Sequence, residues 1–146
     1  MKLKPFRLLI VVMAALCLNS CKEVAINDVV KKKYIAGLPS QSNYILYEFN
    51  ADVKASFSIN NITLISGNEK TVVEQFSFIN SQTMSGHKVT DFNKKFDRGI
   101  YEFTFRIDSD INYPLEEFIN IDYTIDGKEY HLNNLNVKKG GQFNKR

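Results

Sequence analysis

The strongest constraint on the fold is a strict alternation of apolar and polar side chains along residues 100–107. The apolar positions are Tyr101, Phe103, Phe105 and Ile107, and the polar positions between them are Glu102, Thr104 and Arg106. Because successive side chains of a β-strand point to opposite faces, this pattern predicts a strand with one buried and one solvent-facing side. Antiparallel sheets commonly contain such half-buried strands.

The Asp126-Gly127 dipeptide predicts a tight β-hairpin, because both residues tolerate the positive φ angles of two-residue hairpin turns. A two-residue turn places Ile125 opposite Lys128 and thereby fixes the register of the two strands. The resulting pairs are Tyr123 with Tyr130, Ile121 with Leu132 and Asp122 with His131. Apolar partners then share one face, while Asn120, Asp122, His131 and Asn133 share the other.

The same period of two recurs from Asn43 onwards. It predicts strands at 44–49, 55–59, 62–66, 71–79, 100–107 and 117–125, with a weak strand around Val89. The apolar residues Phe57 and Ile59 are out of step with those that follow, which predicts a bulge or tight turn at Asn60-Asn61. Seven or eight short strands predict an all-β antiparallel β-sandwich, immunoglobulin-like in size and strand number, with a small open β-barrel as the alternative.

The first residues have the organisation of a secretory signal. Lys2, Lys4 and Arg7 precede an unbroken apolar run from Leu8 to Leu18. As a helix this run covers roughly 16 Å, little more than half of a hydrocarbon layer about 30 Å thick. The run therefore predicts a cleaved signal peptide and not a transmembrane helix.

Leu18, Asn19, Ser20 and Cys21 resemble the lipobox of bacterial lipoproteins. The resemblance implies cleavage between Ser20 and Cys21, a diacylglyceryl group on the Cys21 sulfur and acylation, as with palmitate, of its new amine. Two or three acyl chains hold a protein stably in a membrane. In Gram-negative lipoproteins, Lys22 and Glu23 in place of an aspartate after the cysteine imply the outer membrane, at its periplasmic face or at the cell surface. An ordinary signal peptide is the alternative.

These features divide the chain into four parts. Residues 1–20 are expected to be the signal peptide, 21–42 the lipidated N-terminus and a solvated spacer, 43–137 the β-sandwich domain, and 138–146 a basic C-terminal tail. Within the spacer, the Lys31–Lys33 run has two alternative interpretations. These lysines contact anionic lipid headgroups, or residues 31–36 pair as an edge strand that lysines protect.

Charge and cysteine content exclude two classes of protein. The chain has 19 basic and 16 acidic residues, and removal of residues 1–20 takes away three basic residues and no acidic one, leaving 16 of each. Nucleic-acid binding requires a concentrated basic surface, so no nucleic-acid partner is expected. Cys17 leaves with the signal and Cys21 is acylated, so the mature chain is not a disulfide-stabilised protein.

The sequence predicts no catalytic, metal or cofactor site. His87 and His131 have no neighbouring ligand at metal-site spacing, and Asp108 and Asp110 lack the glycine and distal glutamate of a calcium loop. Asp122 and His131 have the residue types of an orienter and a base, but no nucleophile accompanies them. A surface ion pair across two strands is the preferred interpretation.

One set of tyrosines and two segments are candidates for binding. Tyr44, Tyr47, Tyr101 and Tyr113 offer rings on which sugars can stack, residues 81–95 form the longest weakly patterned segment, and the tail from Lys138 offers contacts to phosphate or lipid. The prediction is a lipid-anchored, non-catalytic binding or assembly module with an envelope protein as partner. The alternatives are a glycan-binding surface lipoprotein, an inhibitor or immunity lipoprotein, and a small hydrolase that uses residues 81–95 and the Asp122-His131 face.

Overall fold

The structure is a computed structural model that describes residues 24–108 and 116–144, and its regular elements are all β-strands. The strands are β1 (Val24–Ile26), β2 (Val29–Ile35), β3 (Tyr44–Val53), β4 (Phe57–Ser66), β5 (Glu69–Val72), β6 (Phe76–Asn80), β7 (Ser85–Val89), β8 (Lys95–Phe96), β9 (Gly99–Asp108), β10 (Glu117–Ile125) and β11 (Lys128–Asn144). The predicted all-β class is confirmed. Within the described ranges, no helix is long and apolar enough to cross a membrane.

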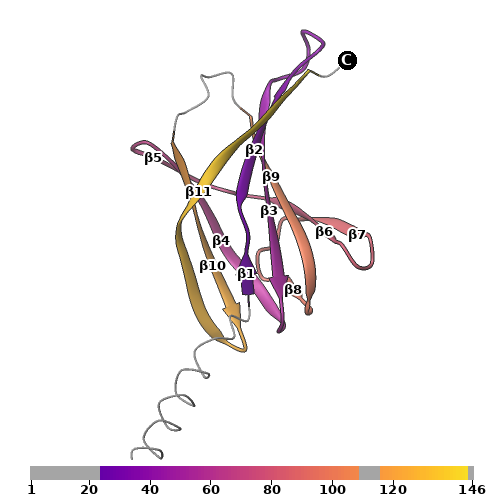
Figure 1. Cartoon of the computed structure of the whole chain (residues 1–146), viewed down its shortest axis with the longest axis vertical. Helices are drawn as coiled ribbons and strands as arrows, with labels where there is room; N and C mark the ends of the chain where they lie inside the picture. Colours follow the sequence, from indigo (N-terminus) through magenta and orange to yellow (C-terminus); the bar gives the residue numbers. More distant parts are fainter. Residues whose placement is uncertain (1–23, 109–115, 145–146) are drawn as a thin grey trace, which may run out of the picture.

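The strands form one mixed sheet that curls into a half-barrel (Figure 1). The order along the sheet is β5-β4-β10-β11-β2-β3-β9-β6-β7, with β1 attached to β3 and β8 attached to β4. The long strand β11 joins two halves of the sheet, β5-β4-β10 on one side and β2-β3-β9-β6-β7 on the other. It pairs with β10 up to Asn136 and with β2 from Val137 onwards. This second pairing is parallel, so the prediction of a purely antiparallel fold is wrong at β2 and β11. The curled sheet is consistent with the open-barrel alternative.

Both ends of the expected domain need correction. Residues 24–35 form β1 and β2 and are not a solvated spacer, and β2 lies between β3 and β11 and not at an edge. Residues 138–144 continue β11 and pair in parallel with β2, so this part of the expected tail is ordered in the sheet. The two segments support each other, because each supplies the backbone partners that the other needs.

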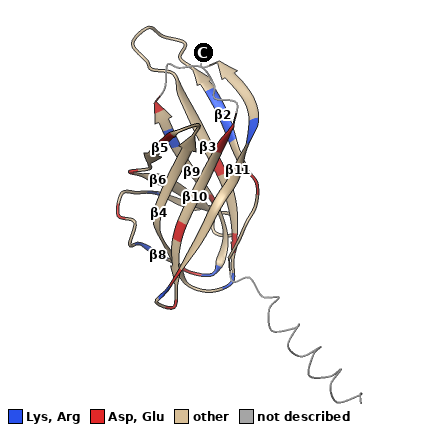
Figure 2. Ribbon diagram, turned by 90° about the vertical axis from the view of Figure 1, so that its left-hand side faces the viewer, with Lys and Arg blue, Asp and Glu red and all other residues tan. Residues whose placement is uncertain are grey.

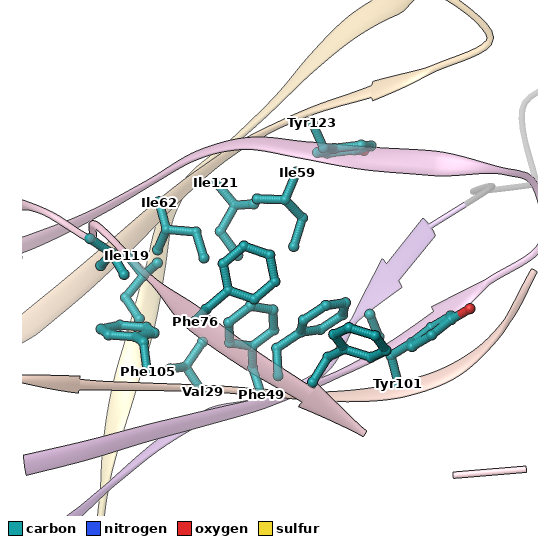
Figure 3. Close-up of a cluster of buried hydrophobic side chains, with 14 of the residues drawn as sticks. Val29, Phe49, Ile59, Ile62, Phe76, Tyr101, Phe105, Ile119, Ile121 and Tyr123 are labelled. Carbon is teal, nitrogen blue, oxygen red and sulfur yellow. The ribbon is translucent and has the colours of Figure 1, made fainter. Parts of the chain in front are cut away.

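The core lies inside the curl, between side chains of both halves of the sheet (Figure 3). Phe103, Ile62 and Ile119 are completely buried there, and the Phe57 ring of β4 meets the Phe103 ring of β9 edge-on at a centroid distance of 6.2 Å. The inward set predicted from residues 100–107 is confirmed for Tyr101, Phe103 and Phe105, which are buried, while Ile107 is partly buried. Aromatic contacts across the core therefore hold the two halves of the curled sheet against each other.

The bulge predicted at Asn60-Asn61 is confirmed. The register of β10 against β4 shifts between Asp122 and Tyr123, which pair with Asn61 and Ile59. The extra residue, Asn60, brings Ile62 and Leu64 back to the face of Phe57 and Ile59, and all four side chains are buried.

The hairpin at Asp126-Gly127 has the predicted register from Ile125 opposite Lys128 to Ile121 opposite Leu132. Asp126 and Gly127 have φ angles of 49° and 76°, as a type I′ turn requires. Beyond Leu132 the strands slip by one residue, because Asn134 adopts a φ of 58°. Its backbone N–H donates to the Asn120 side chain at 2.8 Å, so the predicted register does not extend to Asn120 and Asn133.

The strand predicted over residues 71–79 is divided in two. β5 pairs with β4 and β6 pairs with β9, so they belong to different halves of the sheet. Between them Val73 is buried and its N–H donates to the Ile62 carbonyl, which turns the chain towards the core. The weak strand predicted around Val89 is confirmed as β7.

Candidate functional site

The Asp122-His131 face predicted from the hairpin is present on the outer surface of β10 and β11. His131 Nδ1 lies 2.7 Å from Asp122 Oδ1, and the Asn61 side chain of β4 donates to Asp122 Oδ2 at 3.3 Å. Asn61 is a partner that the sequence did not reveal. The hydrogen bonds thus link His131 to Asp122 and Asp122 to Asn61, which join the outer faces of β11, β10 and β4.

The other candidates for chemistry are dispersed. Asp108 accepts hydrogen bonds from Arg106, and Asp110 lies outside the described residues. Within residues 24–108 and 116–144, no three potential metal ligands gather at one place. Within residues 81–95, β7 carries the buried Val89 and Phe92 packs against the core through Phe76, whereas the other side chains of this segment are exposed.

A buried ion pair is the main polar feature of the interior. Lys31 Nζ donates to Glu117 Oε2 at 2.8 Å, and the two side chains are 1% and 2% exposed. The Tyr47 hydroxyl lies 3.2 Å and 3.1 Å from the two oxygens of the same carboxylate. These residues come from β2, β3 and β10, so this cluster ties the two halves of the curled sheet together.

The four tyrosines predicted as candidate rings for sugar stacking differ in their position and burial. Tyr47 and Tyr101 are buried in the core, so neither offers a ring to a ligand. Tyr113 lies outside the described residues. Tyr44 is partly exposed on the outer face of β3, where its ring is part of a larger aromatic surface.

This surface, here called the aromatic strip, consists of Phe143, Tyr34, Tyr44 and Arg106. The rings of Phe143 and Tyr34 stack at a centroid distance of 5.3 Å, and those of Tyr34 and Tyr44 at 4.9 Å. The Arg106 guanidinium lies 4.4 Å from the centroid of the Tyr44 ring. The strip thus runs across β11, β2, β3 and β9, side by side in the sheet.

Pairing explains why these side chains meet. Phe143 is opposite Tyr34, and Tyr34 is opposite Tyr44, so the three rings stand in one row on the outer face. Arg106 projects from β9 on the same face, since it pairs with Leu46 two residues from Tyr44. The hydrogen bond from Arg106 to Asp108 raises the pKa of Arg106, and this ion pair holds the guanidinium at the end of the row.

A groove lies beside the Tyr44 end of the strip. Its volume is about 370 Å³, and it is lined by Ser40, Gln41, Ser42, Tyr44 and Arg106. The connection between β2 and β3 forms one wall of the groove. It is braced by the Ala36 N–H, which donates to the Asn43 side chain at 2.9 Å, and by the Gln41 N–H, which donates to the Leu38 carbonyl at 3.0 Å.

Sequence reasoning found Tyr44 but missed its partners. Tyr34 lies in the segment interpreted as a spacer, and Phe143 lies in the segment interpreted as a tail. The alternative that residues 31–36 pair as a strand was the available signal for β2, because residues 29–33 show no apolar–polar alternation. Phe143 had no comparable signal, because its position depends on the parallel pairing of β11 with β2.

The predicted processing site at Ser20 and Cys21 lies outside the described residues. No protein-family model matches this chain, and no curated protein is significantly similar to it in sequence.

Proposed function

We propose that the protein is a lipid-anchored, non-catalytic binding module of the bacterial cell envelope, held at the outer membrane through Cys21. The lipobox-like residues Leu18 to Cys21 and the short apolar run before them support the anchor. The aromatic strip supports the binding role, because three large rings on one outer face form a rigid surface of the kind that protein interfaces favour.

The observation that carries this proposal is the position of the strip relative to the first strand. β1 lies near one end of the molecule, whereas the β2–β3 connection and the end of β11, which flank the strip, lie at the other end (Figure 1). Val24 follows Cys21 by three residues, which span at most about 11 Å. A lipid on Cys21 would hold the β1 end at the membrane and direct the strip away from it.

Charge supports a protein or neutral ligand over a polyanion. Basic and acidic residues are both scattered along the strands and loops, with blue segments on β2 and β11 (Figure 2). Several of the basic side chains there are paired: Lys32 with Glu48, and Lys138 with Asp28 at 2.7 Å. The paired charges weaken the long-range attraction that a polyanion partner requires.

As a finer description of the fold, we infer a sandwich of immunoglobulin-like size. Packing of Phe57 against Phe103 and Tyr101 across the curl supports two facing layers. An experimental structure in which β5 and β7 pair and close the sheet would contradict this description.

The anchor is tested by replacing Cys21 with Ser. The variant should not incorporate labelled palmitate and should be found in the soluble fraction, whereas the parent chain should sediment with membranes. Continued labelling of the variant would refute the assignment.

The binding role is tested by a photo-crosslinking residue, p-benzoylphenylalanine, placed at position 143 in the native envelope. Position 130 is the matched control, because Tyr130 is also a partly exposed aromatic on β11 but is distant from the strip. A discrete adduct should form from position 143 and not from position 130. Equal labelling from both positions, or none from 143, would contradict a binding role for the strip.

The hydrolase alternative is tested at its own residues. His131→Ala and His87→Ala should leave every activity of envelope extracts unchanged. Loss of a turnover activity in a folded variant would show that the protein is an enzyme.

A further inference from the structure

We propose that the aromatic strip and the groove beside it bind a neutral oligosaccharide. This inference rests on the binding function proposed for the strip and names the chemical class of its ligand. Three observations support it: the polar lining of the groove, the pairing of Arg106 with Asp108 and the exposed ring of Phe143.

The lining of the groove suits a ligand rich in hydroxyl groups. Ser40 and Ser42 each provide a hydroxyl that donates and accepts, Gln41 provides an amide with both functions, and Arg106 provides donors. Sugar hydroxyls also donate and accept, so they can satisfy such a mixed set of groups. A purely apolar ligand would leave these groups without partners at a cost in free energy.

The charge balance favours a neutral sugar over an acidic one. Among the described residues that line this groove, Arg106 alone has a basic side chain, and Asp108 lies 2.6 Å from its Nη2. The nearest acidic group thus already neutralises the guanidinium. An anionic ligand would have to compete with Asp108 for it.

Stacking is available at one end of the strip and not along its middle. The Tyr44 ring has Tyr34 on one face and Arg106 over it, so the faces of the central rings are taken up within the strip. Phe143 ends the row and is 45% exposed. Tyr34 covers one of its faces, and among the described strands β11 has β2 alone as neighbour over residues 138–144, so the other face is directed over the sheet edge. A pyranose ring can place its apolar C–H face there.

Two adjacent glycines differ in a way that makes this site testable. A Cβ on Gly140 would lie 2.8 Å from the Lys31 carbonyl oxygen, so the close approach of β11 to β2 requires glycine there. A Cβ on Gly141 would lie 3.4 Å from two carbons of the Phe143 ring, an ordinary contact that the fold tolerates. Gly141 therefore leaves the flank of the Phe143 ring uncovered, and a larger side chain at position 141 would cover it.

The experiment uses the full chain, purified from membranes in detergent, and a panel of purified neutral hexasaccharides of glucose, mannose, xylose and galactose. Polygalacturonate and heparin serve as anionic probes. Isothermal titration should detect at least one neutral hexasaccharide. Phe143→Ala and Gln41→Ala should each weaken that binding about tenfold, a loss of about 1.4 kcal/mol, and Gly141→Val should weaken it with the fold retained. Tyr130→Ala should leave it unchanged.

Three results would overturn the proposal. These are no binding of any neutral hexasaccharide by the folded chain, binding that Phe143→Ala and Gly141→Val leave unchanged, and binding confined to the anionic probes and abolished by salt. The test is separable from that of the proposed function. An adduct from position 143 in the envelope, together with no hexasaccharide binding, retains the anchored binding module and refutes the saccharide.

Discussion

Replacement of Lys31 by Met tests the buried ion pair and should destabilise the fold severely. With Nζ and Oε2 separated by 2.8 Å, Coulomb's law gives an attraction of about 6 kcal/mol at an effective dielectric constant of about 20. The intact pair adds little net stability, because removing both charges from water costs several kcal/mol each. The single replacement loses the attraction and leaves the Glu117 carboxylate buried, so we expect a loss of about 3–5 kcal/mol.

The neighbouring residue on β2 provides the matched control. Lys32 points to the outer face and pairs there with Glu48, and its side chain is 32% exposed. Lys32→Met should therefore cost less than about 1 kcal/mol. The triple replacement Lys31→Met, Tyr47→Phe and Glu117→Leu removes all the polar groups of the cluster together and should return the stability to within about 1 kcal/mol of the parent, or above it.

Urea denaturation followed by circular dichroism measures these differences. With a slope of about 2 kcal/mol/M, the Lys31→Met midpoint should fall by about 2 M and the Lys32→Met midpoint by less than about 0.5 M. If Lys31→Met and Lys32→Met cost the same, or if the triple variant is as unstable as Lys31→Met, the reasoning about the buried charge is refuted.

Three further predictions concern the core, a turn and alkaline pH. Phe103→Ala should lower the free energy of unfolding by about 3–5 kcal/mol, since this ring is completely buried. Phe143→Ala should lower it by less than about 1 kcal/mol. Equal losses for the two variants in urea denaturation would contradict the burial argument. Gly127→Ala should lower the free energy of unfolding by about 1 kcal/mol or more, because Gly127 has a φ of 76°. Gly141→Ala should leave the melting temperature in thermal denaturation nearly unchanged. The hydrogen bond to Glu48 raises the pKa of Lys32, and burial raises the pKa of Tyr101. The native state therefore holds protons that the unfolded chain releases. The contribution of these two groups to stability should be constant between about pH 7 and 9 and should fall as the pH rises above about 10. Tyr101→Phe should reduce that fall in urea denaturation, and an unchanged fall would remove Tyr101 as a cause.

The local features of the fold were predictable from particular residues. Asp126-Gly127 fixed the β10–β11 register as far as Leu132, and the phase change between Ile59 and Ile62 located the bulge at Asn60. Turn chemistry and alternation act over a few residues, so the sequence expresses them directly. The same local signals found the Asp122-His131 contact, because both residues belong to one hairpin.

Tertiary structure decided the features that join distant segments. The parallel pairing of β11 with β2 turned an expected spacer and an expected tail into one part of the sheet, and it assembled the aromatic strip from Tyr34, Tyr44 and Phe143. Tertiary structure also buries Lys31 against Glu117 of β10, although the Lys-Lys-Lys run of residues 31–33 predicts exposure to solvent. Neither segment contains the partner that makes it a strand, and the free energy that orders both is gained when they pair and cover the core. That gain depends on the whole fold and has no signature in either segment.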